Sequence, residues 1–244
     1  MVPIVGLLLL VAVFVFTLWG RSGPVDLSAD LAPGTSLKVR IPNAEVTLEA
    51  SADDQVHVRM TGSYFGGKPT LRARTTHGVT EVRGGCRPRL FSRCSVAVTV
   101  QLPPALPTTV KAENGRVTAS GLIGRLDLQT TNGTIETAGT VGRVDLRTTN
   151  GDIRVADAAS AAVAATTTNG SVTLHFVNPP DSVDAGSTNG SVTVQVPVEG
   201  VTYRVDANTT NGNVDDHTVP TDSTSRRSIT AHTTNGAITV EPAP

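Results

Sequence analysis

The residues that could do chemistry in this chain are few and do not cluster in the sequence. Its five histidines stand singly, without the H-E-x-x-H pattern or the Cys/His spacing of metal sites. The densest polar group is Asp215-Asp216-His217, which we expect to form a solvated turn. No Gly-x-Ser-x-Gly elbow or phosphate-cradling glycine loop is present. We therefore expect no catalytic residue, no metal site, no cofactor and no enzymatic activity.

The two cysteines, Cys86 and Cys94, are eight positions apart. This spacing is too long for a redox C-x-x-C motif, and no histidine lies nearby to complete a zinc site. In an exported protein, two such cysteines most simply close a loop as a disulfide. Two free thiols or a metal site are the alternatives.

Arginines crowd this cysteine loop, and an apolar pair lies near its centre. Loops on rigid scaffolds often carry recognition. This loop is either a solvated cap of the fold or a binding site for an anionic envelope polymer or lipid head groups. The residues of the candidate binding loop are Arg83, Arg87, Arg89, Leu90, Phe91 and Arg93.

An apolar run over residues 2–20 is long enough to cross the roughly 30 Å of membrane hydrocarbon as a helix. Trp19 lies at its end, where an interfacial ring belongs. No Ala-x-Ala-like site follows, so we expect an uncleaved transmembrane anchor over residues 1–21, with a cleaved signal peptide as the alternative. Arg21 follows the run and no Lys or Arg precedes it, which would place the C-terminus inside, but this rule weakens for long following domains. The expected location is the cytoplasmic membrane, single-pass, with the C-terminal domain extracytoplasmic.

The elements that follow this segment are predicted from composition and alternation. Residues 22–34 are polar, contain Gly and Pro and show no pattern, which predicts a linker. Alternating apolar and polar residues then predict a β-repeat domain over residues 35–240, followed by a tail at 241–244. Its first half, 35–107, is irregular and includes the cysteine loop, whereas 108–240 repeats regularly.

The regular half repeats an Asn-Gly pair that is preceded by Thr-Thr in most copies. Successive asparagines are 18, 18, 19, 20, 22 and 24 residues apart. A near-fixed period of this kind is typical of stacked-repeat architectures. Asn and Gly both tolerate a left-handed corner, so we expect these pairs to be structural turns. They are Asn114, Gly115, Asn132, Gly133, Asn150, Gly151, Asn169, Gly170, Asn189, Gly190, Asn211, Gly212, Asn235 and Gly236.

Two all-β architectures fit these repeats. Asn-Gly between alternating runs is a strong hairpin signal, and a meander of hairpins forming a sandwich would pair Leu146 with Val155. In a β-solenoid each strand instead pairs with its equivalent one coil away, so that identical residues stack in ladders. Only stacking explains the recurring Thr-Thr. We therefore expect a β-solenoid, or β-helix-like stack, of 18–24-residue coils, preceded by one N-terminal transmembrane helix.

Composition agrees with a slender rod whose net charge is close to zero. Aromatic residues make up only 3% of the chain, so a thick core that depends on large rings is not expected. The net charge is −1, which gives no electrostatic reason to expect nucleic-acid binding.

A β-helix can also carry a polysaccharide-acting enzyme, which needs clustered carboxylates. The position after each Asn-Gly pair tests this alternative, because stacking would bring those side chains together. Only one of the seven is acidic: Arg116, Thr134, Asp152, Ser171, Ser191, Asn213 and Ala237. No acidic pair builds up, so such an enzyme remains a remote alternative.

The apolar N-terminal segment and the Thr-Thr-Asn-Gly-x-Ile/Val-x-Val phrase, clearest over Thr148–Val155, resemble the bacterial DUF4097 family. The resemblance covers residues 35–240. Members of that family carry the label "putative adhesin" and β-strand repeats, which implies display at a cell surface. The family offers no established catalytic or binding residue to carry over.

These observations together predict a non-catalytic cell-envelope protein, adhesin-like or a structural scaffold. Its expected partners are the membrane, through the N-terminal helix, and an envelope polymer or protein. The alternative is a sensory or regulatory ectodomain of an envelope-stress pathway that signals through the single membrane segment. The sequence sets no oligomeric state.

Overall fold

A computed structural model describes residues 22–86 and 93–244 of the 244-residue chain. Throughout these two ranges the regular structure is β-strand, and none of their residues forms an α-helix. Accordingly, those ranges contain no helix long and apolar enough to span a membrane. The predicted transmembrane segment, residues 1–21, lies outside the described residues.

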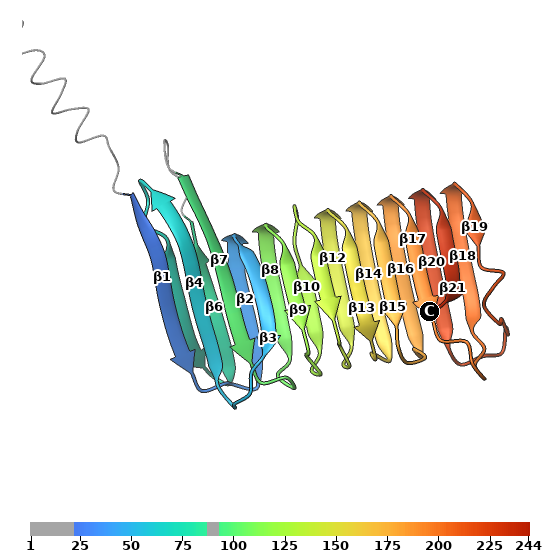
Figure 1. The fold of residues 1–244 in the computed structure, drawn as a ribbon, viewed down its shortest axis with the longest axis horizontal. Coiled ribbons are helices and arrows are strands. Elements are labelled where there is room, and N and C mark those ends of the chain that lie inside the picture. The colour runs from blue at the N-terminus through green and yellow to red at the C-terminus, as the bar shows by residue number, and fades with distance from the viewer. Residues whose placement is uncertain (1–21, 87–92) are drawn as a thin grey trace, which may run out of the picture.

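The described strands form two sheets that face each other along an elongated, flattened rod (Figure 1). Within the described ranges, sheet A has 11 strands in the order β1 (Ser22–Leu31), β4 (Val56–Phe65), β7 (Arg93–Leu102), β3 (Glu45–Ala50), β9 (Val117–Ser120), β11 (Ile135–Ala138), β13 (Ile153–Ala158), β15 (Val172–Phe176), β17 (Val192–Val196), β21 (Ile238–Pro242) and β19 (Val214–Asp215). Sheet B has 10 over the same ranges, in the order β18 (Arg204–Asn211), β20 (Ser228–Asn235), β16 (Ser182–Asn189), β14 (Ala162–Asn169), β12 (Val144–Asn150), β10 (Leu126–Gln129), β8 (Thr108–Asn114), β2 (Ser36–Asn43), β6 (Val79–Gly85) and β5 (Thr70–Thr76).

Each repeat of the regular half contributes one strand to each sheet. Strand β12 ends at Asn150 in sheet B, and the chain then crosses to β13 in sheet A. β12 pairs in parallel with β10 and β14, so Leu146 lies beside Leu128 and Ala165 rather than opposite Val155. The repeats are therefore stacked, solenoid-like coils, and the hairpin alternative is wrong for them.

The core is a thin layer of aliphatic side chains between the two sheets. Alternate residues point inward, and Val144, Leu146 and Ile153 have no exposed surface. Only two aromatic side chains of the described ranges are completely buried, Phe176 and Tyr203. Burial of apolar area contributes about 25 cal/mol per Å², so this fold gains its stability from many small side chains along the stack, as the composition predicts.

The opening half includes antiparallel strands. β4 pairs antiparallel with both β1 and β7, and β5 and β6 form a hairpin. That hairpin turns at His77-Gly78, where φ is 50° and 76°. Positive φ at both central positions is the condition for a type I′ turn. A two-residue hairpin turn is therefore present at this phrase, which resembles the repeat but carries His77 in place of asparagine.

The segment predicted as a linker, residues 22–34, instead contributes strand β1. All ten residues of β1 pair with β4, and Val25 is buried. Gly23 and Pro24 obscured this strand in the sequence. Pro24 is tolerated because β1 lies at the edge of sheet A, where a missing N–H breaks no second ladder. At the other end, the predicted tail begins inside β21, which extends to Pro242.

The order of the coils along the rod differs from their order along the chain at both ends. The last coil, β20–β21, lies between β16–β17 and β18–β19 (Figure 1). Similarly, β2–β3 lies between β6–β7 and β8–β9. Residues 216–227 lead the chain from β19, in the outermost coil, back to β20. The last coil therefore fills the position between β16–β17 and β18–β19. Both β20 and β2 therefore have a partner on each side.

Candidate binding surface

Cys86 and Cys94 form a disulfide, with their Cα atoms 5.8 Å apart. Cys86 follows β6 of sheet B, and Cys94 lies in β7 of sheet A. Because β6 and β7 stack as one coil beside β2–β3, the disulfide closes the edge that an Asn-Gly turn closes in other coils. The predicted disulfide is present and fixes this coil covalently.

Part of the candidate binding loop lies outside the described residues: Arg87, Arg89, Leu90 and Phe91. Arg83 lies on β6, where its guanidinium pairs with Glu81. Arg93 opens β7 opposite Phe65 and lines a hollow of about 430 Å³ that also includes Tyr64. The two described arginines thus lie on different sheets. A binding role for the loop stays a prediction.

The turn asparagines form one ladder of side-chain amides along an edge of the rod. Asn150 donates a 2.8 Å hydrogen bond from Nδ2 to Oδ1 of Asn132 and accepts one of 2.8 Å from Asn169. Every neighbouring pair is joined in this way, including Asn43 from the irregular half. In spatial order the ladder is Asn43, Asn114, Asn132, Asn150, Asn169, Asn189, Asn235 and Asn211.

For six of these asparagines, the residue two positions earlier is a Thr or Ser that links adjacent coils from inside. Thr148 donates a 2.9 Å hydrogen bond from Oγ1 to the carbonyl oxygen of Gly133 in the neighbouring coil. The same contact is made by Thr130, Thr167, Ser187, Thr209 and Thr233. The residue directly before each of these six asparagines points to solvent. Together these residues form a row of exposed threonines: Thr131, Thr149, Thr168, Thr188, Thr234 and Thr210.

The glycine after each asparagine allows the coils to approach. At Gly151 an added Cβ would lie under 3.0 Å from the carbonyl oxygen of Gly133, and φ is +154°. Among the described residues only His77 and Asp157 are non-glycine residues with positive φ. The prediction of a left-handed corner at the asparagines was therefore wrong. The turn spreads over the crossing between sheets and does not need the two-residue geometry of a hairpin.

Several titratable side chains of the described ranges pair with each other, and these ranges hold no group of three or more His, Cys, Asp or Glu that could hold a metal ion. His57 bridges β1 and the loop before β4, with Nδ1 2.7 Å from Asp30 and Nε2 3.0 Å from Asp53. Hydrogen bonds from the His57 ring to the carboxylates of Asp30 and then Asp53 raise the pKa of His57. The Ser51 hydroxyl, His57 and the Gln55 N–H lower the pKa of Asp53 to about 2. These exposed side chains link the edge strand β1 to β4 and to the loop before it.

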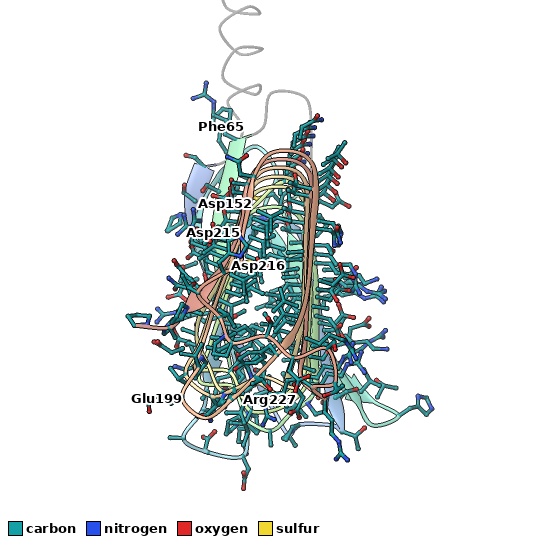
Figure 2. The ribbon with its side chains drawn as sticks, turned by 90° about the vertical axis from the view of Figure 1, so that its right-hand side faces the viewer. Phe65, Asp152, Glu199, Asp215, Asp216 and Arg227 are labelled. Carbon is teal, nitrogen blue, oxygen red and sulfur yellow. A yellow bond between two sulfur atoms is a disulfide. The ribbon has the colours of Figure 1, made fainter. Side chains whose placement is uncertain are left out.

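The remaining acidic candidates are also separate. The Asp152 carboxylate accepts hydrogen bonds from the Ser171 N–H at 2.9 Å and from Arg154 at 2.7 Å, and these hold its pKa below the usual value against the opposing effect of burial. Asp215 ends β19, and the neighbouring His217 side chain is 88% exposed. Figure 2 labels Asp152 and Asp215 on one side of the rod and Glu199 towards the opposite edge from Phe65.

A row of cationic residues on the outer face of sheet B was missed by sequence reasoning. The strand register places Arg72 opposite Arg83, Arg83 beside Arg40, and Arg40 beside Lys111. These residues come from four adjacent strands, β5, β6, β2 and β8. Only Arg83 belonged to the candidate binding loop. The signal that could have found the others is the phase of each strand relative to the asparagine ladder, but irregular spacing before residue 108 hides it.

A two-sheet stack of this kind, stitched by amide and hydroxyl ladders, defines a class of solenoid-like β-repeat protein. The chain belongs to the DUF4097 family: the family model described as Toastrack DUF4097 matches residues 94–241. No curated protein matches the chain.

Several solved structures resemble this chain at low identity. A "putative cell adhesion protein" from Clostridium sporogenes is 13% identical, with 90% of this chain and 100% of that chain covered and a TM-score of 0.42. A "putative adhesin" from Bacteroides fragilis is 13% identical, with 89% and 97% covered and a TM-score of 0.46. A "putative lipid binding protein" from Parabacteroides distasonis is 12% identical, with 91% and 98% covered and a TM-score of 0.37.

Proposed function

We propose that this chain is a non-catalytic protein of the bacterial cell envelope, an adhesin-like or structural scaffold displayed outside the cytoplasmic membrane. The observation that carries the proposal is the continuous asparagine ladder from Asn43 to Asn211. The ladder uses the repeated polar residues to hold coils together. What remains is a rigid rod with two broad exposed faces, which suits display and contact.

The proposed attachment is a transmembrane helix over residues 2–20. Ser22, which only Arg21 separates from this segment, already pairs with Phe65 as the first residue of β1. A rod that starts this close to its anchor is held near the bilayer and has little freedom to tumble. The Cys86–Cys94 disulfide supports an oxidising, extracytoplasmic location.

Selective labelling of the full-length chain in cells tests this proposal. We expect the chain in the membrane fraction, with its C-terminal end cut by a protease added outside the cytoplasmic membrane. We also expect both cysteines to resist alkylation until a reductant is added. Cys86→Ser is the matched control, because it leaves Cys94 as a free thiol that must react. A chain recovered from the cytosol with two reactive thiols would contradict the proposal.

A further inference from the structure

The cationic row on sheet B borders a chain of hollows. Arg40, Arg72 and Arg83 line one of about 440 Å³, beside Gly85 and the disulfide. Arg40 also lines the next hollow, of about 230 Å³, together with Lys38, Lys111 and one carboxylate, that of Asp127. Lys111 in turn borders a third of about 560 Å³ that contains Arg147 and the first of the exposed threonines. The shared lining residues make one shallow groove that runs across the strands, along the rod.

Positive charge is concentrated on this face. Strands β5, β6, β2 and β8 of sheet B carry six Lys or Arg and two Glu, a formal charge of +4. The four strands of sheet A at the same end, β1, β4, β7 and β3, carry four acidic residues and two Arg, a formal charge of −2. The whole chain has a net charge of −1. The basic groove is therefore a local feature that the total charge conceals.

Most of the groove's cations are not neutralised. Arg83 pairs with Glu81, which also contacts Arg74 at 3.4 Å. Within the described ranges Arg40, Arg72 and Lys111 form no ion pair, and all three side chains are exposed. A run of like charges on adjacent strands is unfavourable in the free protein. An anionic ligand that lies among them would remove this repulsion.

We infer that this groove binds a linear, phosphate-bearing polymer of the cell envelope, an inference that rests on the proposed envelope function. Three guanidinium groups around one hollow suit a phosphate, which offers more acceptor oxygens than a carboxylate. Adjacent strands are about 4.8 Å apart, so the row from Arg72 to Lys111 extends over about 14 Å. A row of this length takes several phosphates in succession, which favours a polymer over a single anion.

Binding of the purified full-length chain, in non-ionic detergent, to fluorescently labelled inorganic polyphosphate tests this inference. The variant R40S/R72S/R83S should bind at least about tenfold more weakly at low salt, because it loses three charge-assisted contacts. It should also lower the slope of log affinity against log salt by about 2–3, since fewer counterions are released. The matched control R116S/R154S/R204S removes the same charge away from the groove and should change affinity by less than about threefold.

Competitors separate the sources of phosphate. Unlabelled polyphosphate should displace the probe, whereas orthophosphate or soluble glycerol phosphate at the same phosphate concentration should not. Effective competition by either monomer would overturn the polymer inference, as would equal weakening in the two triple variants. Lys111→Gln, compared with Arg154→Gln, repeats the test with single exposed side chains if the triple variant folds poorly. Because the assay uses purified protein, it can fail or succeed independently of where the chain is located in the cell.

Discussion

At the scale of single residues, the glycines of the repeat are fixed by the distance to the next coil. Five of the seven have φ between 145° and 155°, whereas Gly133 and Gly212 are not in that group. All seven would nevertheless bring a Cβ under 3.0 Å from a backbone oxygen of an adjacent coil. Close approach is thus the shared requirement, and positive φ is an addition at most positions.

Gly151→Ala should therefore lower the free energy of unfolding more than a substitution at a glycine that has positive φ but no close neighbour. We expect the free energy of unfolding to fall by about 3 kcal/mol or more, because a backbone oxygen cannot move aside without opening the ladder. Gly139→Ala is the matched control: its φ is +61°, but the nearest atom to an added Cβ is 3.9 Å away. It should cost about 1 kcal/mol. Equal losses in urea unfolding would contradict the close-approach explanation.

The contacts of His57 give stability a defined dependence on pH. Its pKa is raised above 6.5 by Asp30 and Asp53, so its contribution is complete below 6.5 and is lost as the pH rises through the folded-state value. The pKa of Asp53 is lowered from 3.8 to about 2, so that contribution is present above 3.8 and is lost as the pH falls towards 2. Both contributions are present together between these limits.

Melting temperatures measured across pH check this expectation. The difference between the native chain and His57→Gln should be largest near pH 5 and should shrink above neutral pH (about pH 7). The Asp30→Asn variant should bring the pKa of His57 back towards 6.5 in an NMR titration, since it removes the largest cause of the shift. A constant difference in melting temperature across this range would show that the ring does not stabilise the edge strand through its charge.

At the scale of the elements, the Asn ladder joins coils that already share two sheets. Asn150 makes two side-chain hydrogen bonds within it, whereas Asn211, at the end, makes one. A net hydrogen bond contributes about 1 kcal/mol. Asn150→Ala should then lower the free energy of unfolding by about 2 kcal/mol and Asn211→Ala by about half as much. Equal effects would mean that the amides bond mainly to water.

The strands of the regular half were predictable because every physical signal there agrees. Alternation gave the inward residues, such as Leu146 and Ile153, and the repeated Thr-Thr indicated stacking. The hairpin interpretation competed because Asn-Gly is common to both architectures. Local sequence does not say whether the strand that contains Val155 pairs with the strand just before it or crosses to the other sheet. Only Thr148, two positions before Asn150, distinguishes the two, because it has a partner in the neighbouring coil.

The surface groove was not predictable for a related reason. Arg40, Arg72 and Lys111 are separated by long stretches of chain and carry no motif. They meet because β2 lies between β6 and β8 in sheet B. The irregular spacing before residue 108 hides this pairing, as Gly23 and Pro24 hide strand β1. Where the repeat is irregular, the strand register can be read only from the structure.

At the scale of the whole molecule, the repeats fix the shape of the rod but not the order of its coils. The strands β18 and β20 are nearly equivalent: Val205 and Ala207 of one align with Ile229 and Ala231 of the other. Either strand could pack beside β16. The structure places β20 beside β16, and β18 beyond β20. Residues 216–227 connect the outer coil back to β20.

Engineered cysteines test this order directly. Asp184 lies beside Thr230, and Thr230 lies beside Asp206, so Asp184 and Asp206 are two strands, or about 10 Å, apart. A disulfide requires Cα atoms closer than about 7 Å. The pair D184C/T230C should therefore oxidise to a disulfide, whereas D184C/D206C should keep two alkylatable thiols. All three positions are exposed, so folding should be preserved in both variants. If D184C/D206C formed the disulfide instead, the coils would stack in chain order and the final coil would not lock the end of the rod.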